Sequence, residues 1–202
     1  VLKALRSPSR SLKDFKIFDV NRPWDAITHY TAPLTKPEEF EVYPNRDSIP
    51  FMQQYKFDPD WKVKQFVRGT LRLNGWAKAW SEIFEEIETL NGEIGEKRLI
   101  EMSENFWQDN AYGENEPDRV ILCVDLKAEK GSGVVWHKTF KMDAWGDDRG
   151  TAMARLVSFP VYFAVKAIAN KQIEFGVNAA TSNPSIVDKW LRNIKELSLI
   201  HI

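Results

Sequence analysis

The chain has 202 residues, of which 43% are hydrophobic, and its 28 basic side chains nearly balance its 29 acidic ones. This length and composition suffice for one domain with a buried core, and the balanced charge without a basic stripe argues against nucleic acid or an anionic membrane surface as a partner. The one cysteine, Cys123, lies in an apolar run and is interpreted as a buried residue of a protein from a reducing, cytoplasmic compartment.

The first half of the chain predicts short strands and then two helices. Residues 12–37 are rich in proline, charged and aromatic residues without a sustained period, which is typical of an extended connector. The elements expected after it are a strand at 40–43, a helix at 49–55, a strand within 62–73 and helices at 76–90 and 96–107. The helix at 76–90 has the clearest pattern, since its apolar residues recur every three or four positions.

The second half predicts a β-hairpin followed by two helices. Strands are expected over residues 119–128 and 134–144, joined by a loop whose glycines can adopt positive backbone angles. Helices are expected over residues 152–170 and 184–197, with a turn and a short strand at residues 171–180 between them. The longest apolar stretch is interrupted by a serine, a proline and a lysine, so no membrane span is expected.

Two polar segments could form a binding site for an anion. They are Asn45-Arg-Asp-Ser48 and Arg68-Gly-Thr-Leu-Arg72. An arginine fork is well shaped to hold a carboxylate through two parallel N–H bonds, so a small polar acid is the first ligand to consider. The first segment is equally good turn and helix-start chemistry, because aspartate or serine can cap the helix that follows. Local chemistry leaves both interpretations open and favours the turn.

A third polar segment, residues 145–152, opens onto the helix expected at 152–170. The free N–H groups at the start of that helix could receive an anion. Asp147 and Asp148 could instead cap the same N–H groups, and this second interpretation is favoured.

Side chains for metal or nucleophilic catalysis form no recognisable set. The histidines, at positions 29, 137 and 201, lack a zinc-binding spacing, so no metal site is expected. His137 lies within an expected strand and is interpreted as an ordinary sheet residue. The glycines at 131 and 133 form no dinucleotide fingerprint, because the third glycine is missing and a strand follows. Catalytic and cofactor-binding residues therefore stay unknown.

Three tracts, taken in order, resemble landmarks of the saccharopine dehydrogenase family. They are Tyr43-Pro-Asn-Arg-Asp-Ser-Ile-Pro50, Phe66-Val-Arg-Gly-Thr-Leu-Arg-Leu-Asn-Gly-Trp76 and Gly150-Thr-Ala-Met-Ala-Arg-Leu-Val-Ser-Phe-Pro160. Their order and spacing are most similar to the C-terminal, substrate-binding half of the glutamate-forming enzymes, from about residue 38 to about residue 195.

The resemblance implies an α+β fold with a mixed β-sheet and helices packed on one face. In this family such a domain is the C-terminal domain of a Rossmann-type dehydrogenase, and the Rossmann domain itself is absent here. The implied division is a connector at residues 1–37, a substrate-binding and dimerisation domain at residues 38–196, and a non-native or truncated tail at residues 197–202. The implied partners are the protein's own Rossmann domain and a second copy in a homodimer.

The resemblance also implies a function. Members of the family oxidise the CH–NH bond of saccharopine by hydride transfer to NADP or NAD, and hydrolysis of the imine gives aminoadipate semialdehyde and glutamate. The chain is then expected to be the substrate-binding portion of an NAD(P)-dependent oxidoreductase of lysine metabolism, inactive alone, with the cofactor bound mainly by a domain outside this chain. Saccharopine carries three carboxylates, which suits a site rich in arginine.

The family motifs place substrate contacts on four residues. Arg46 matches the arginine of the family's Pro-Asn-Arg-Asp-Ser motif, and Thr70, Leu71 and Arg72 match its Thr-Leu-Arg triplet. The resemblance implies that both arginines hold carboxylates, that the threonine forms a hydrogen bond, and that the leucine contributes backbone contact and shape. The residues expected to support the site are Asn45, Asp47, Ser48 and Arg68.

Three departures from the family pattern concern the cofactor and the substrate. The chain has no Gly-x-Gly-x-x-Gly unit, the region before the expected hairpin is shorter than in the fungal enzymes, and residues 143–151 differ from the family's glycine-rich turn. Two alternatives therefore stay open. One is a non-catalytic amino-acid-binding or dimerisation module of the same fold, and the other is a dehydrogenase of a related polyamine precursor.

Overall fold

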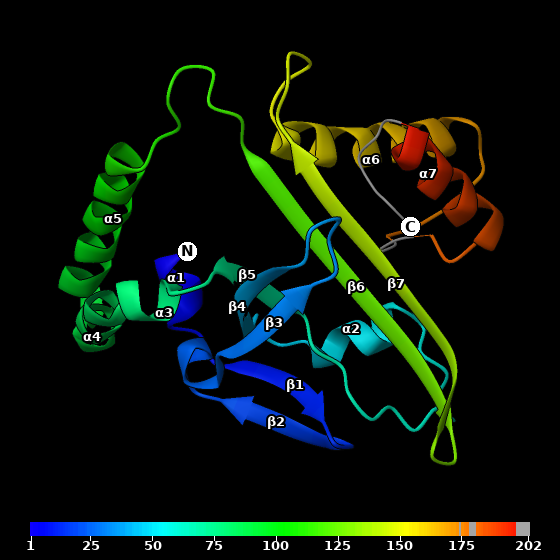
Figure 1. The fold of residues 1–202 in the computed structure, drawn as a ribbon, viewed down its shortest axis with the longest axis horizontal. Helices are drawn as coiled ribbons and strands as arrows, with labels where there is room; N and C mark the ends of the chain where they lie inside the picture. The colour runs from blue at the N-terminus through cyan, green and yellow to red at the C-terminus, as the bar shows by residue number, and fades with distance from the viewer. Residues whose placement is uncertain (174, 178–180, 197–202) are drawn as a thin grey trace. The chain divides into compact units, whose positions relative to one another are not determined.

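The structure of the chain is a computed structural model that describes residues 1–173, 175–177 and 181–196 (Figure 1). These residues form two compact units, the first made of Val1–Ala32 and Pro37–Ala111 and the second of Pro33–Lys36 and the chain from Tyr112 onward. The tail expected at residues 197–202 lies outside the described residues. Part of the stretch at 171–180 also lies outside them, and its described residues form turns and bends without a strand.

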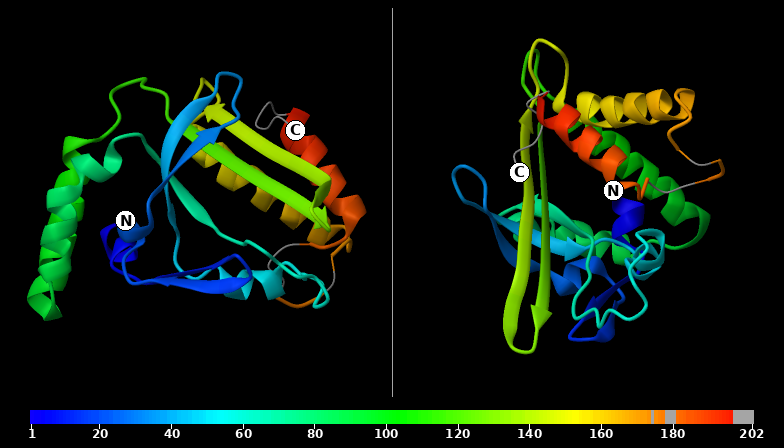
Figure 2. Two further views of the ribbon diagram at one scale, coloured as in Figure 1. Left: turned by 60° about the horizontal axis from the view of Figure 1, so that its bottom comes forward. Right: turned by 90° about the vertical axis from the view of Figure 1, so that its right-hand side faces the viewer.

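The first unit contains two small antiparallel sheets. Its strands are β1 (Ser9–Lys13), β2 (Lys16–Val20), β3 (Thr28–Ala32), β4 (Glu38–Pro44) and β5 (Gly69–Leu73). Strand β1 pairs with β2, and β4 lies between β3 and β5 (Figure 2). Much of the connector expected at residues 12–37 is therefore strand. These short strands are stabilised by pairing with their neighbours, which a stretch without its own period does not reveal.

Helices complete the first unit. They are α1 (Leu2–Leu5), the 3-10 helix η1 (Pro23–Ala26), α2 (Ile49–Gln54), α3 (Trp76–Ala79), α4 (Ser81–Thr89) and α5 (Gly92–Asp109). The single helix expected at 76–90 is divided at Trp80, whose φ of −102° and ψ of 6° leave the helical region. Its apolar face still packs into one core, whose buried members are Leu2, Leu5, Tyr43, Trp76, Phe84, Ile87, Leu99 and Met102.

The second unit contains a long β-hairpin and two helices. They are β6 (Arg119–Lys130), β7 (Gly133–Trp145), α6 (Ala152–Ala169) and α7 (Pro184–Glu196). The turn between the strands contains Gly131 with a φ of 64°, a backbone angle that glycine adopts at no steric cost. One end of the hairpin packs on α6 through Met142 and Ala144 against Ala152 (Figure 2). Cys123, expected to be buried, is half-buried on β6.

The α+β class expected from the sequence is confirmed, since helices and small antiparallel sheets make up both units. The strands in the described part of the chain form three separate antiparallel sheets, where one mixed sheet was expected. Short loops join three of the four strand pairs, β1–β2, β3–β4 and β6–β7, which accounts for their antiparallel arrangement. Connections of a few residues can join only antiparallel neighbours, whereas a parallel pair needs a crossover of a dozen residues or more.

Helix α6 exposes an apolar stripe. Met153, Val157, Val161 and Val165 follow one another at intervals of four residues and are each more than half exposed. Within the described ranges, α6 is the one helix that is long and apolar enough to cross a membrane, by length and composition alone. Helices of soluble proteins pass the same test, so the expectation of no membrane span stays a prediction.

Candidate functional site

Strands β4 and β5 bring the first two polar segments together. Their antiparallel register sets Glu41 opposite Arg72 and Tyr43 opposite Thr70, so these four side chains share one face of the sheet. The pairing continues past the strand ends, where the N–H of Asn45 donates to the carbonyl of Arg68 at 2.7 Å. Two segments that are twenty residues apart in the sequence therefore form one continuous polar surface.

The first segment is both a structural turn and a support for the second. Asp47 caps helix α2, because its Oδ1 accepts a hydrogen bond from the N–H of Ile49 at 3.0 Å. Ser48, the alternative cap, is fully buried and has another role, since its hydroxyl accepts the N–H of Arg68 at 3.0 Å. The turn interpretation is thus correct for Asp47, and Ser48 links the two segments directly.

Arg46 lies at the bend of this turn with its side chain exposed. Its φ of 53° is in the left-handed region, which costs a non-glycine residue about 1–3 kcal/mol and is often found at binding sites. The conformation is held by the N–H of Arg10, which donates to the Arg46 carbonyl at 2.9 Å, and by an ion pair between Arg10 and Asp47. The backbone of Arg46 is therefore well fixed while its guanidinium extends from the turn.

Arg72 rests on two aromatic rings. Its guanidinium lies 5.6 Å from the centre of the Tyr43 ring and 5.5 Å from that of Trp76, and it donates a hydrogen bond to the Tyr43 hydroxyl at 3.1 Å. The two rings stack on each other in the core, with centres 5.3 Å apart. A guanidinium has five N–H donors, so most of them stay available for a ligand.

Leu71 lies on the opposite face of β5 from Thr70 and Arg72, opposite Val42. Its side chain therefore does not join the polar surface, and the backbone contact expected for it stays a prediction. The neighbouring Gly69 packs so closely on β4 that a Cβ there would lie 2.8 Å from the Val42 side chain. A larger residue at position 69 would force the two strands apart at the site.

The arginines of the two polar segments lack the ion pairs with carboxylates that most other described arginines of the chain form. Arg10, Arg22, Arg98 and Arg119 each form an ion pair with a carboxylate. Among the residues that the structure describes, no carboxylate lies within ion-pair distance of Arg46, Arg68 or Arg72. Guanidinium groups placed together without such partners form a positive surface for an external anion.

The start of helix α6 does not provide an anion site. The carboxylate of the buried Asp118 accepts the N–H groups of Ala152 at 2.6 Å and Met153 at 2.8 Å, and the Thr151 hydroxyl accepts that of Ala154. The Asp118 carboxylate thus occupies the N–H groups that an external anion would bind. Asp118 precedes the first residue of the helix by 34 positions. The expected caps, Asp147 and Asp148, are replaced by Asp118 because the hairpin carries that residue to the helix start.

Asp147 instead forms ion pairs with the side chains of Arg149 and Arg155. The side chain of Arg149 donates hydrogen bonds to it, with the backbone N–H of Arg149 and the charge of Arg155 adding to the effect, and together they lower the pKa of Asp147 to about 2. Because the folded pKa lies below the ordinary value of 3.8, this carboxylate stabilises the fold above about pH 4, and the contribution is lost as the pH falls through about 2.

An NMR titration of Asp147 is accordingly expected to give a pKa of about 2. Substituting Arg149 by alanine should raise this pKa towards 3.8, since the main hydrogen-bond donor is removed. Added salt should reduce the shift of this exposed pair. An unchanged Asp147 pKa in the alanine variant would contradict the assignment.

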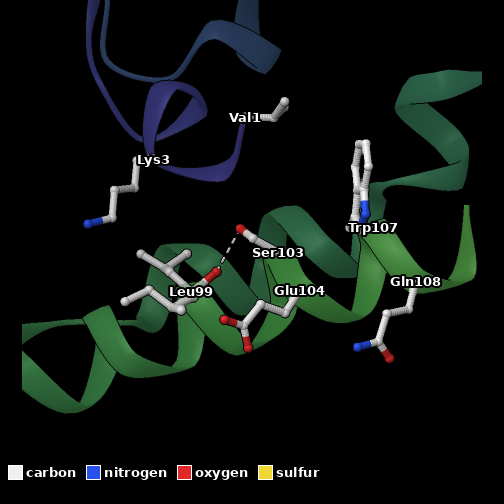
Figure 3. Close-up of a pocket in the computed structure, with 8 residues that line it drawn as sticks. Val1, Lys3, Leu99, Ser103, Glu104, Trp107 and Gln108 are labelled. Atoms are coloured by element: carbon white, nitrogen blue, oxygen red, sulfur yellow. Dashed lines mark hydrogen bonds between the residues drawn. The ribbon is translucent and has the colours of Figure 1, made fainter. Parts of the chain in front are cut away.

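A cavity of the first unit lies elsewhere, between α1 and α5 (Figure 3). It has a volume of about 450 Å³ and is lined by Val1, Lys3, Leu99, Ile100, Ser103, Glu104, Trp107 and Gln108. None of the residues expected at the site lines it. Its two charged lining residues, Lys3 and Glu104, have opposite signs, so it lacks the cluster of arginines found on the two polar segments.

Three comparisons relate the chain to known proteins. The family model of the saccharopine dehydrogenase C-terminal domain matches residues 1–199. Saccharopine dehydrogenase (NADP(+), L-glutamate-forming) of Pyricularia oryzae is 23% identical, and the match covers 97% of this chain and 58% of that protein. The alignment has 263 positions, more than the 202 residues of the chain, so the relative carries additional residues within the matched region.

The fold is similar to that of apo histidine-tagged saccharopine dehydrogenase (L-Glu forming) from Saccharomyces cerevisiae. The TM-score is 0.71 with 20% identity, and the match covers 99% of this chain and 59% of that one. The chain therefore spans a little under three fifths of the length of both relatives. Because the family model matches nearly its whole length, the chain belongs to the saccharopine dehydrogenase C-terminal domain family.

Proposed function

We propose that this chain is the substrate-binding portion of an NAD(P)-dependent oxidoreductase that acts on the CH–NH bond of saccharopine or of a similar amino-acid adduct. The observation that carries the proposal is the set of guanidinium groups without carboxylate partners on the joined segments at β4 and β5. Such a surface suits a ligand with several carboxylates. The family and the names of its relatives point to the same class of substrate.

The proposed roles follow from the placement of each residue. Arg46 and Arg72 bind substrate carboxylates, and Thr70, which lies on the same face as Arg72, forms a hydrogen bond with its hydroxyl. Asn45 and Ser48 hold the backbone of Arg68, and Asp47 fixes the turn that carries Arg46 by accepting the N–H of Ile49. Saccharopine is flexible and carries three carboxylates. When these are held by the protein, the carbon that loses hydride is oriented for reaction. The nicotinamide cofactor accepts the hydride.

The described residues do not fit a dinucleotide. Strand β7 leads into α6 through a turn with Gly146 and Gly150, which superficially resembles a pyrophosphate-binding arrangement. However, the Asp118 carboxylate occupies the first N–H groups of α6 and would repel a phosphate. We therefore propose that NADP or NAD binds to a separate Rossmann domain of the complete protein. We also propose that this protein is a cytoplasmic enzyme of lysine metabolism, as expected from the sequence.

The test is the activity of the complete gene product. Reduction of NAD or NADP is measured by absorbance with saccharopine as substrate, and the products glutamate and aminoadipate semialdehyde are identified by mass spectrometry. The proposal expects saccharopine-dependent reduction of one cofactor and none with this chain alone. Binding of saccharopine without any turnover would favour the non-catalytic amino-acid-binding module, and turnover of a polyamine precursor alone would favour the related dehydrogenase.

A homodimer is proposed on a separate observation. One face of the β6–β7 hairpin exposes large apolar side chains away from the end that packs on α6, including Leu126 and Trp136, which are 41% and 49% exposed. A two-stranded hairpin is marginally stable without further packing, so burial of this face is favourable.

Replacing Leu126 by lysine is expected to shift the chain from dimer to monomer, because the change removes an apolar side chain from the interface and adds a second charge beside Lys138. Light scattering coupled to size-exclusion chromatography measures the mass. Lys127→Ala, on the opposite face of the same strand, is the control and should remain dimeric. A monomeric wild-type chain, or a dimeric Leu126→Lys variant, would rule out this interface.

A further inference from the structure

We infer that Arg68 binds a substrate carboxylate directly, as Arg72 does. The two arginines would then hold the two ends of the ligand, with Thr70 between them. The inference rests on the proposed function, because it assigns a further specificity-determining residue to the same site. The family motifs alone predict only a supporting role for Arg68. The structure provides three independent reasons to give it a direct role.

The first reason is its position directly before β5. Successive side chains of an extended strand point to opposite faces, so the alternation that sets Thr70 and Arg72 on one face assigns Arg68 to that face as well. The hydrogen bond from the Asn45 N–H to the Arg68 carbonyl shows that the extended pairing reaches Arg68. At about 3.3 Å per residue, the Cα atoms of the two arginines lie about 13 Å apart. This separation suits an elongated ligand better than a single carboxylate.

The second reason is the way its guanidinium is held. The central carbon lies 3.6 Å from the centre of the Phe51 ring, which is the distance of direct stacking. Stacking uses the flat face of a guanidinium and leaves its N–H edge free for a carboxylate. Phe51 belongs to helix α2, whose start is capped by Asp47. The first polar segment therefore positions the platform on which Arg68 rests.

The third reason is the equivalence of the two arginines. Each stacks on aromatic side chains, Arg68 on Phe51 and Arg72 on Tyr43 and Trp76. Each is half-buried, and neither forms an ion pair with a carboxylate in the described part of the chain. By contrast, the half-buried Arg22 forms an ion pair with Glu88. Arg68 and Arg72 thus present similarly held guanidinium groups on the same polar surface.

The experiment measures binding to the complete gene product by calorimetry, with saccharopine, L-glutamate and L-lysine as separate probes. Glutamate and lysine represent the two halves of saccharopine. Arg68→Ala is expected to weaken saccharopine binding about ten- to hundredfold, the usual loss for a charged hydrogen-bonding pair. It should weaken only one of the two half ligands, and Arg72→Ala should weaken the other.

Two further variants separate binding from folding and from overall charge. Arg68→Lys keeps the charge and the aliphatic stem over Phe51 but loses the fork, so its affinity should fall between those of wild type and Arg68→Ala. Lys62→Ala removes an exposed positive charge six residues earlier and should leave all three affinities unchanged. Thermal unfolding midpoints of the variants establish that each is folded.

Each outcome decides a separate claim. If Arg72→Ala weakens saccharopine binding while Arg68→Ala and Arg68→Lys do not, the role of Arg68 is overturned and the proposed function stands. If both alanine variants weaken the same half ligand, the two-ended arrangement is overturned. If saccharopine does not bind the wild-type protein at all, the proposed function fails and this inference fails with it.

Discussion

Substitution of Arg72 by alanine is expected to weaken saccharopine binding by about 1.5–3 kcal/mol, or ten- to hundredfold in Kd. The affinity for NADP or NAD should not change, since the described residues offer no dinucleotide site. The fold should survive, because the Tyr43 and Trp76 rings beneath the guanidinium stack on each other in the core. Calorimetric titrations of substrate and cofactor against the complete protein measure both quantities.

Two controls sharpen this prediction. Arg72→Lys keeps the positive charge but cannot form two parallel hydrogen bonds, so it should recover only part of the affinity. Arg192→Ala removes an exposed arginine from α7 in the other unit and should bind saccharopine as the wild type does. Equal losses of substrate and cofactor affinity in the Arg72 variants would indicate general destabilisation, and an unchanged Kd would remove Arg72 from the site.

Features that depend on neighbours in the sequence could be predicted from the sequence. The cap formed by Asp47 is an example, because it joins residues only two positions apart. The strand at 40–43, the end of β5 and the placement of Thr70 and Arg72 on one face also follow from local alternation. The family resemblance required only the order of three tracts.

Features that depend on distant contacts could not be predicted in this way. The cap of α6 comes from Asp118, which lies in a loop before the hairpin and reaches the helix only because β7 returns the chain to it. The stacking of Arg72 on Tyr43 depends on the register of β4 and β5, for which the sequence offers no local signal. The functional interpretation of Arg68 likewise needed its contact with Phe51.

Replacing Glu41 by alanine is expected to lower the free energy of unfolding by about 3 kcal/mol. This residue is 6% exposed, and its carboxylate accepts the N–H groups of Gly75 at 2.9 Å and Ala77 at 2.6 Å. Alanine would leave both donors without a partner at the start of α3. Glu41→Gln keeps one strong acceptor and should cost about half as much. Chemical denaturation measures both changes, and a loss below 1 kcal/mol for alanine would contradict the assignment.

The substrate affinity of the Glu41 variants distinguishes two roles for this carboxylate. Glu41 lies opposite Arg72, yet both its oxygens bind backbone N–H groups beside Trp76, so it leaves the guanidinium of Arg72 free. If it acted only as a nearby negative charge, its removal would tighten the binding of an anion. If it positions Trp76 beneath Arg72, its removal should weaken binding. We expect weaker binding in Glu41→Ala, because loss of the Trp76 platform misplaces the group that contacts the substrate directly.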